Sequence, residues 1–291
     1  MADPRVSFQT FLEEEINRCR GLYAPIKSSL LERLFVRKAS CKKLHPNLED
    51  EFCDPKIGPN YEIISNYQEE LRTLQAHAQP QKFKERLIVE KAHPDGYILL
   101  NGHHRWAAAL RSALPSVPIK IVSLTQTSDV YKMLENAKHD QRAALDLDEV
   151  VFAPAQDGAA EKALPFPANK VYQQQLRRGI PELLRFLKNH GYDIWVYSAQ
   201  YYSMDYIQVF FKLYGLQIDN IVTGTSRKGQ QSAEEKKQLE TMITKKYAVT
   251  VHPALRSLTR ISSEAKTFEE YELTGNPETW AQEIMEILSK L

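Results

Sequence analysis

The sequence predicts two domains, an α+β domain followed by an α/β domain. The chain has 291 residues, 43% of them hydrophobic and 26% charged, and this length favours two domains over one. In the first half, a strand–turn–helix unit lies between two further strands and follows helical segments. In the second half, strands and helices alternate, which is typical of a sheet covered by helices.

Four segments are expected along the chain. N-terminal helices at 1–35 precede the α+β domain at 36–125, a helical linker at 126–140 and the α/β domain at 141–291. Pro25 is expected to separate two of the early helices, because proline interrupts helical hydrogen bonding. A polar, proline-punctuated loop at 45–55 and an amphipathic helix at 61–77 follow.

The remaining elements are predicted from apolar runs and helical spacing. Strands are expected at 86–90, 117–122, 142–148, 193–198, 218–222 and 246–251. Helices are expected at 130–137, 181–190, 205–214 and 280–288.

Composition limits the function classes. The net charge of +1 gives no global basic field, so we expect no nucleic-acid partner. No apolar run is long enough to span a bilayer, and the N-terminus lacks the pattern of a signal peptide. Three cysteines without CxxC spacing argue for a reducing compartment and against a disulfide framework or a zinc site. A cytoplasmic protein is expected.

The segment 98–110 is the most informative part of the chain. An apolar run stops at Asn101 and Gly102, and a strong helix former follows, with His103, His104 and Arg105 in its first turn. Unpaired N–H groups and a partial positive charge make a helix N-terminus an anion site, and an arginine there can bind a phosphate. The segment therefore predicts a phosphate-binding turn. The alternative is an ordinary solvated helix start.

The sequence Gly-His-His-Arg-Trp-Ala-Ala-Ala at 102–109 resembles the signature of ParB/sulfiredoxin-like domains, and the resemblance covers about 36–125. In that family the Gly-x-x-Arg turn holds nucleotide phosphates, which implies this role for Asn101, Gly102, His103, His104 and Arg105. Members include DNA-segregation CTPases, sulfinic-acid reductases and free-serine kinases. His103 stands where the reductases have cysteine, and no basic helix-turn-helix follows.

The layout resembles the free-serine kinases, in which an acidic residue of an upstream loop faces the turn. This resemblance implies that one of Glu49, Asp50 and Glu51 deprotonates the acceptor, and we favour Glu51. Phosphoryl transfer to an alcohol needs such a base beside the bound phosphate. The alternative for this loop is a solvated acidic turn.

The second half contains a carboxylate pair after an expected strand. Alternation would place Asp146 and Asp148 on one side of an extended segment. Two carboxylates at a strand end suit Mg²⁺ and nucleophile-plus-acid chemistry on a phosphoester. The alternative is two solvated aspartates in a loop.

Three features of the second half resemble the haloacid-dehalogenase-like (HAD) phosphohydrolases, which have a Rossmann-like α/β fold. They are the sequence Asp-Leu-Asp-Glu-Val at 146–150, Ser198 at the end of an apolar strand, and Lys228. The resemblance implies that Asp146 is the nucleophile, Asp148 the general acid/base, both are Mg²⁺ ligands, and Ser198 and Lys228 bind phosphate. The family's fourth motif supplies further aspartates, but 249–256 has no carboxylate. A degenerate domain is therefore predicted, with Glu264, Glu269 or Glu270 as alternative ligands.

Together these patterns predict a nucleotide-dependent kinase that acts on the hydroxyl of a small metabolite such as an amino acid. ATP, ADP or CTP with Mg²⁺ would be its cofactors, and the nucleotide and a small-molecule substrate its partners, with no membrane. One alternative is a HAD-type phosphatase that uses Asp146 and Asp148. The other is a nucleotide-sensing module without turnover. The acceptor, the preferred nucleotide and the oligomeric state stay open.

Overall fold

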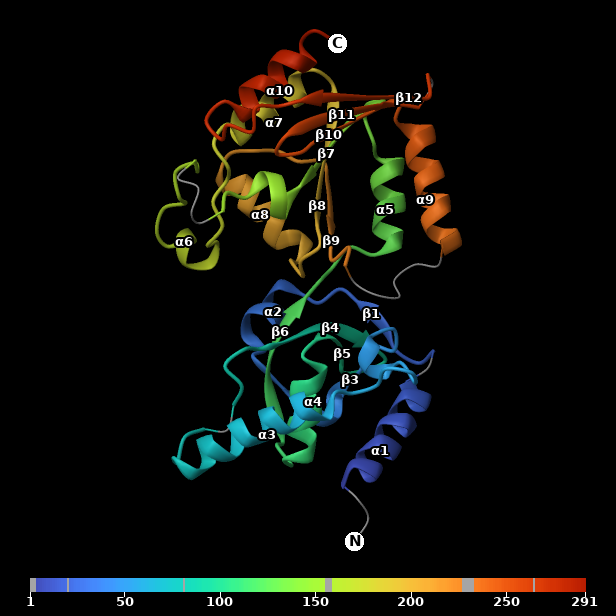
Figure 1. The fold of residues 1–291 in the computed structure, drawn as a ribbon, viewed down its shortest axis with the longest axis vertical. Coiled ribbons are helices and arrows are strands. Elements are labelled where there is room, and N and C mark those ends of the chain that lie inside the picture. The colour runs from blue at the N-terminus through green and yellow to red at the C-terminus, as the bar shows by residue number, and fades with distance from the viewer. Residues whose placement is uncertain (1–3, 20, 81, 155–158, 227–232, 264) are drawn as a thin grey trace. The chain divides into compact units, whose positions relative to one another are not determined.

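The computed structural model describes residues 4–19, 21–80, 82–154, 159–226, 233–263 and 265–291, and divides into two compact units (Figure 1). The first unit ends at Leu124 and the second begins at Thr125. Each unit has its own mixed sheet and its own buried apolar core. No helix among the described residues is long and apolar enough to cross a bilayer.

The first unit is built on a six-stranded sheet in the order β2-β6-β4-β5-β3, with β1 paired to the end of β4. Its strands are β1 (Ala24–Ile26), β2 (Lys38–Ser40), β3 (Leu44–His45), β4 (Leu87–His93), β5 (Tyr97–Asn101) and β6 (Ser116–Val122). β4 and β5 form an antiparallel hairpin, whereas β4 pairs with β6, and β5 with β3, in parallel.

The described residues of the first unit also form four α-helices and two short 3-10 helices. They are α1 (Pro4–Cys19), α2 (Leu30–Phe35), η1 (Cys41–Lys43), η2 (Glu51–Cys53), α3 (Tyr61–Ala76) and α4 (His103–Arg111). α4 buries Trp106 and three consecutive alanines at 107–109 in the same core as Leu87 and Val89 of β4. The small alanine side chains let this helix lie close to β4 and β6.

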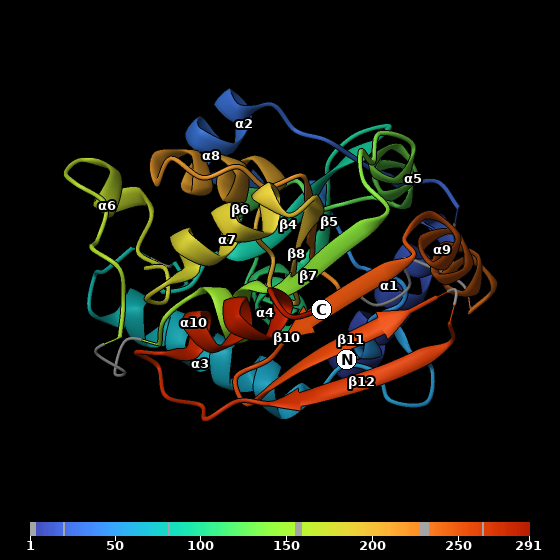
Figure 2. The same ribbon diagram turned by 90° about the horizontal axis from the view of Figure 1, so that it is seen from above.

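The second unit is an α/β domain with a six-stranded sheet in the order β12-β11-β10-β7-β8-β9, seen from above in Figure 2. The strands are β7 (Gln141–Asp146), β8 (Tyr192–Ser198), β9 (Asn220–Thr223), β10 (Val249–Pro253), β11 (Ser257–Ser262) and β12 (Thr267–Glu272). The four strands from β10 to β9 are parallel, and β11 and β12 extend the sheet in antiparallel pairs.

Helices cover both faces of this second sheet (Figure 1). They are α5 (Thr127–Glu135), α6 (Ala168–Val171), α7 (Ile180–Asn189), α8 (Met204–Leu213), α9 (Ala233–Lys246) and α10 (Trp280–Leu288). α7, α8 and α10 enclose the larger core. α5 and α9 pack on the opposite face over Trp195 and Tyr247. The indole N–H of Trp195 donates a hydrogen bond to the phenol oxygen of Tyr247 at 2.9 Å.

Three predictions about elements differ from the structure. The segment 127–135 is not a linker, because Val130 and Leu134 of α5 are buried in the second unit. Pro25 does not simply separate two helices, because it lies in strand β1, which pairs with the end of β4. A short edge strand tolerates proline. α9, β11 and β12 were not predicted, because they carry weak apolar periodicity; most residues of α9 and β12 are exposed, and most of those in β11 are half-buried.

Candidate functional site

The predicted strand–turn–helix is present in the first unit. β5 ends at Asn101, Gly102 adopts φ +103° in the left-handed region, and α4 begins at His103. A Cβ at position 102 would lie 2.9 Å from Cγ of Leu87 and 3.3 Å from a guanidinium nitrogen of Arg105. Both the backbone conformation and the close approach of these side chains therefore require glycine.

Arg105 is buried beneath this turn and its guanidinium has two partners. One terminal nitrogen donates to Oδ1 of Asn101 at 2.8 Å, and the other to Oε2 of Glu85 at 3.2 Å. The Glu85 side chain is 82% exposed, whereas that of Arg105 is 8% exposed. An exposed carboxylate therefore already occupies an anion position beside a buried arginine at the start of a helix.

The two histidines hold the acidic loop against the turn. Nε2 of His103 accepts a hydrogen bond from the backbone N–H of Asn47, and Nε2 of His104 accepts one from Asn60, both at 3.1 Å. Nδ1 of His103 lies 3.7 Å from Oδ1 of Asp50. Segment 47–60 is thus attached to α4 at both of its ends.

Burial keeps both imidazoles neutral near pH 7. Removal from water lowers the pKa of His103 to about 4, against the opposing attraction of Asp50, and burial also lowers the pKa of His104. Their rings therefore act as acceptors for backbone N–H groups and carry no positive charge at neutral pH. Phosphate contacts by His103 and His104 stay a prediction, and the positive charge of the turn comes from Arg105 and the helix end.

Phe52 completes the attachment of the loop. Its ring centroid lies 5.5 Å from that of His103 and 5.1 Å from that of His104. Asp50 caps the short helix η2 by accepting a hydrogen bond from the Phe52 N–H at 3.0 Å. Asp50 is therefore a positioning residue, while its neighbours Glu49 and Glu51 are exposed.

A cleft of about 1140 Å³ lies along this loop. Its lining comes from residues 48–55 and 57–59 on one side and from Gln9, Leu12, Glu13, Ile16 and Asn17 of α1 on the other. The acidic lining residues are Glu13, Glu49, Asp50, Glu51 and Asp54. Such a concentration of carboxylates favours a cationic ligand group, either an ammonium or a hydrated Mg²⁺.

In the second unit, the ends of β7 and β8 bring Asp148 and Ser198 together. The Ser198 hydroxyl donates to Oδ2 of Asp148 at 2.7 Å, and the Ala199 N–H contacts the same oxygen at 3.2 Å. Asp146 accepts the backbone N–H groups of Asp148 and Glu149, both at 2.8 Å. This contact begins one π-helical turn, η3 (Leu147–Val151). The predicted extended alternation of Asp146 and Asp148 is therefore wrong, since the chain coils at Leu147.

Two of the other predicted metal ligands, Glu269 and Glu270, are not brought to this point. Lys228 and Glu264 lie outside the described residues. Glu269 and Glu270 lie in β12, with β10 and β11 between them and β7, and Glu269 pairs with Arg260 at 3.0 Å. Burial lowers the pKa of His252, near the end of β10, to about 4. No carboxylate in the described residues of β10 completes a Mg²⁺ site.

Sequence reasoning missed three contributors to the turn: Glu85, Asn47 and Asn60. Glu85 lies 20 residues before its partner Arg105 in an irregular segment, so no periodicity links them. Asn60 has a detectable signal as the N-cap of α3, yet its bond to His104 depends on tertiary packing.

A family model, the ParB N-terminal domain, matches residues 59–137. The match includes α3, the β4–β5 hairpin, the Gly102–Arg105 turn and β6. This part of the chain is therefore ParB-like. Comparison with curated proteins finds no match, and comparison with solved structures finds none either.

Proposed function

We propose that the first unit is a nucleotide-dependent phosphotransferase that acts on a hydroxyl of a small metabolite, with ATP, ADP or CTP as donor. The observation that carries this proposal is the attachment of the acidic loop to the Gly102–Arg105 turn through His103 and His104. Phosphoryl transfer needs a phosphate anchor and a base at a fixed separation, and two neutral imidazoles hold these parts together.

The turn supplies the phosphate anchor in this proposal. The first backbone N–H groups of α4 and the guanidinium of Arg105 converge there. A nucleotide phosphate would displace the exposed carboxylate of Glu85 and take its place on the arginine. A phosphate can bind a guanidinium with two charge-assisted hydrogen bonds, whereas Glu85 contacts Arg105 through one nitrogen at 3.2 Å, so this exchange favours the phosphate.

The base is assigned to Glu51, with Glu49 as the alternative, because Asp50 caps η2 and faces His103. Both glutamates line the acidic cleft. A carboxylate there would accept the proton of the acceptor hydroxyl, and the surrounding acids would attract Mg²⁺ or the ammonium group of an amino acid.

Phosphorus NMR of the purified chain tests this function. The chain is incubated with Mg²⁺, with ATP, ADP and CTP in turn, and with a pool of hydroxylated amino acids. A new phosphomonoester signal is expected, lost in Arg105→Ala and kept in Arg72→Ala, a matched control whose exposed arginine also pairs with a glutamate. Loss in Glu51→Gln but not in Glu49→Gln identifies the base. Nucleotide binding without any product would replace the kinase with a nucleotide-sensing module.

The second candidate is a Mg²⁺-dependent phosphatase of HAD type in the second unit. The observation in its favour is the 2.7 Å contact between Ser198 and Asp148 at the carboxyl ends of two parallel strands. Release of inorganic phosphate from phosphomonoesters, abolished in Asp146→Asn and retained in Arg105→Ala, is the result that would support it. Full phosphate release by Asp146→Asn would remove it.

A further inference from the structure

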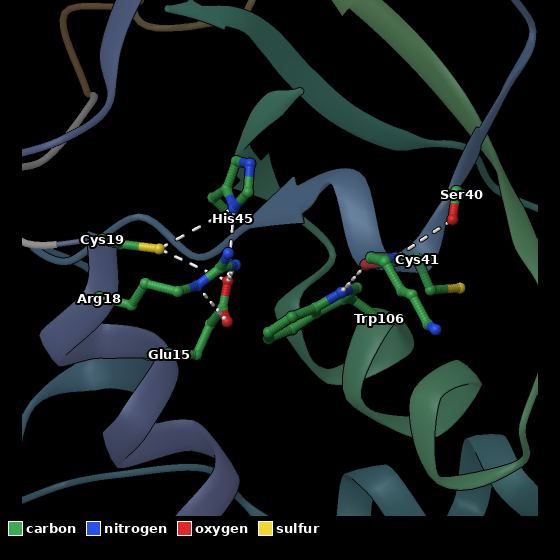
Figure 3. Close-up of polar contacts among 8 residues, drawn as sticks. Glu15, Arg18, Cys19, Ser40, Cys41, His45 and Trp106 are labelled. Carbon is green, nitrogen blue, oxygen red and sulfur yellow. Dashed lines mark hydrogen bonds and ion pairs between the residues drawn. The ribbon is translucent and has the colours of Figure 1, made fainter. Parts of the chain in front are cut away.

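A cluster of three potential metal ligands lies inside the first unit, apart from the turn. Glu15 and Cys19 stand one helical turn apart on α1, and His45 comes from β3 (Figure 3). The residues are 8%, 4% and 2% exposed, respectively. The sequence analysis argued against a zinc site because the three cysteines lack CxxC spacing, and it did not relate Cys19 to Glu15 or His45.

The distances among the ligand atoms match those around one tetrahedral zinc ion. Nδ1 of His45 lies 3.4 Å from Oε1 of Glu15, and Sγ of Cys19 lies 3.5 Å from that oxygen and 3.9 Å from the nitrogen. Zinc bonds of about 2.0 Å to nitrogen and oxygen and about 2.3 Å to sulfur place neighbouring ligands about 3.3 to 3.6 Å apart. An ion fits among the three with a shift of a few tenths of an ångström.

The imidazole is held with Nδ1 toward the other two ligands. Its ring stacks on Tyr23, with centroids 3.7 Å apart. Nε2 points away toward the hairpin turn, where a Cβ on Gly96 would lie 2.6 Å from it. Nε2 is buried and has no hydrogen-bond partner within the part of the chain that the structure describes. The ring therefore has little freedom to turn its other nitrogen toward Glu15.

A cation already lies beside this cluster, because the Glu15 carboxylate accepts hydrogen bonds from the Arg18 guanidinium. Arg18 pairs with Glu15, but its side chain is 53% exposed and can move into water.

We propose that Glu15, Cys19 and His45 form a zinc site that joins the N-terminal helix to the sheet. Zn²⁺ would bind Oε1, Sγ and Nδ1 and displace Arg18 from Oε1. The thiol proton of Cys19 would leave to solvent, and His45 would take the neutral tautomer with its proton on Nε2, since Nδ1 now donates to Glu15 and must free its lone pair for the metal. A water molecule would fill the fourth position. The mixed oxygen, nitrogen and sulfur donors favour Zn²⁺ over Mg²⁺ and Ca²⁺, which take oxygen ligands.

Cobalt titration of the full chain, stripped with chelator, tests the site, because Co²⁺ replaces zinc and reports a thiolate ligand by a charge-transfer band. One equivalent of Co²⁺ is expected to bind with this band and to be displaced by Zn²⁺. Cys19→Ser should lose the band and weaken affinity by about 100-fold or more. Cys41→Ser is the matched control, since Cys41 is an equally buried free cysteine of the same unit.

Arg18→Ala is a second variant that tests the proposal even if Cys19→Ser fails to fold. Removal of the competing cation should strengthen metal binding about fivefold, as expected for one partly exposed ion pair. Binding without a thiolate band, equal loss in Cys41→Ser, or weaker binding by Arg18→Ala would each overturn the proposal.

Discussion

At the scale of single residues, burial determines the charge of the turn. His103 is enclosed by Phe52, by the backbone of the acidic loop and by α4, and the cost of removing its charged form from water lowers its pKa to about 4. The resemblance implied phosphate binding by His103, His104 and Arg105. Burial lowers the pKa of both histidines, so Arg105 carries the positive side-chain charge of the turn near neutral pH.

This lowered pKa makes the stability of the first unit depend on pH. The unfolded chain binds a proton at His103 near pH 6.5, whereas the folded chain binds it only near pH 4. Neutral His103 therefore contributes its full share to the free energy of unfolding above pH 6.5. This share, about 3 kcal/mol, is lost as the pH falls toward 4.

Urea unfolding at several pH values measures this loss. The difference in unfolding free energy between wild type and His103→Gln, which keeps an acceptor for Asn47, should change by that amount between pH 7 and pH 4. The control is His77→Gln, which replaces an exposed histidine at the end of α3. Its unfolding free energy should have the same pH dependence as that of the wild type. An identical pH dependence in His103→Gln would contradict a neutral buried imidazole.

Glu85 is predicted to compete with nucleotide for Arg105. Replacing it with glutamine removes the carboxylate that contacts the guanidinium at 3.2 Å. Because the pair is exposed on one side, it is worth about 1 kcal/mol, so Glu85→Gln should bind nucleotide about fivefold more tightly by calorimetry. Glu69→Gln, which removes an exposed pair with Arg72 on α3, should leave the affinity unchanged. Weaker binding by Glu85→Gln would place the phosphate elsewhere.

At the scale of elements, Gly102 joins β5 to α4. Gly102→Ala is expected to destabilise the first unit by about 1–2 kcal/mol, because φ is +103° and the new Cβ would meet Leu87 at 2.9 Å. Gly21→Ala is the control, since φ is +69° there but no atom lies within 4 Å of the Cβ. Thermal unfolding should show the larger loss for Gly102→Ala, and equal losses would mean that β5 and α4 adjust without strain.

The spacing of apolar residues along the sequence predicted those helices and strands that have an apolar face of their own. The helix at 61–77, the β5 strand, the Gly102 turn and α7 all follow from apolar spacing and turn residues within one short window. Elements that depend on distant partners were missed or misassigned: β1 pairs with the end of β4, and α5 packs on Trp195, 60 residues later.

The same distinction applies to the candidate site. The Gly102–Arg105 turn and the nearby acidic loop were predicted from local residues, and the structure brings Asp50 to His103. The contacts of Arg105 with Glu85, and of Cys19 with His45, join segments 20 and 26 residues apart that no periodicity relates. Tertiary packing creates these contacts, so they could not be predicted from local pattern.

At the scale of the whole molecule, a different phosphate chemistry is proposed for each of the two units, and one experiment separates the two proposals. If the kinase proposal holds, ATP with Mg²⁺ should slow amide hydrogen exchange in peptides covering 47–60 and 101–111, because the ligand stabilises the turn and the attached loop. Peptides covering 141–152 and 192–199, which contain Asp146, Asp148 and Ser198, should be unchanged. Arg105→Ala should abolish the protection, whereas Asp146→Asn should keep it. Protection confined to the second pair of segments would assign phosphate binding to the second unit, because Asp148 and Ser198 then form the occupied site.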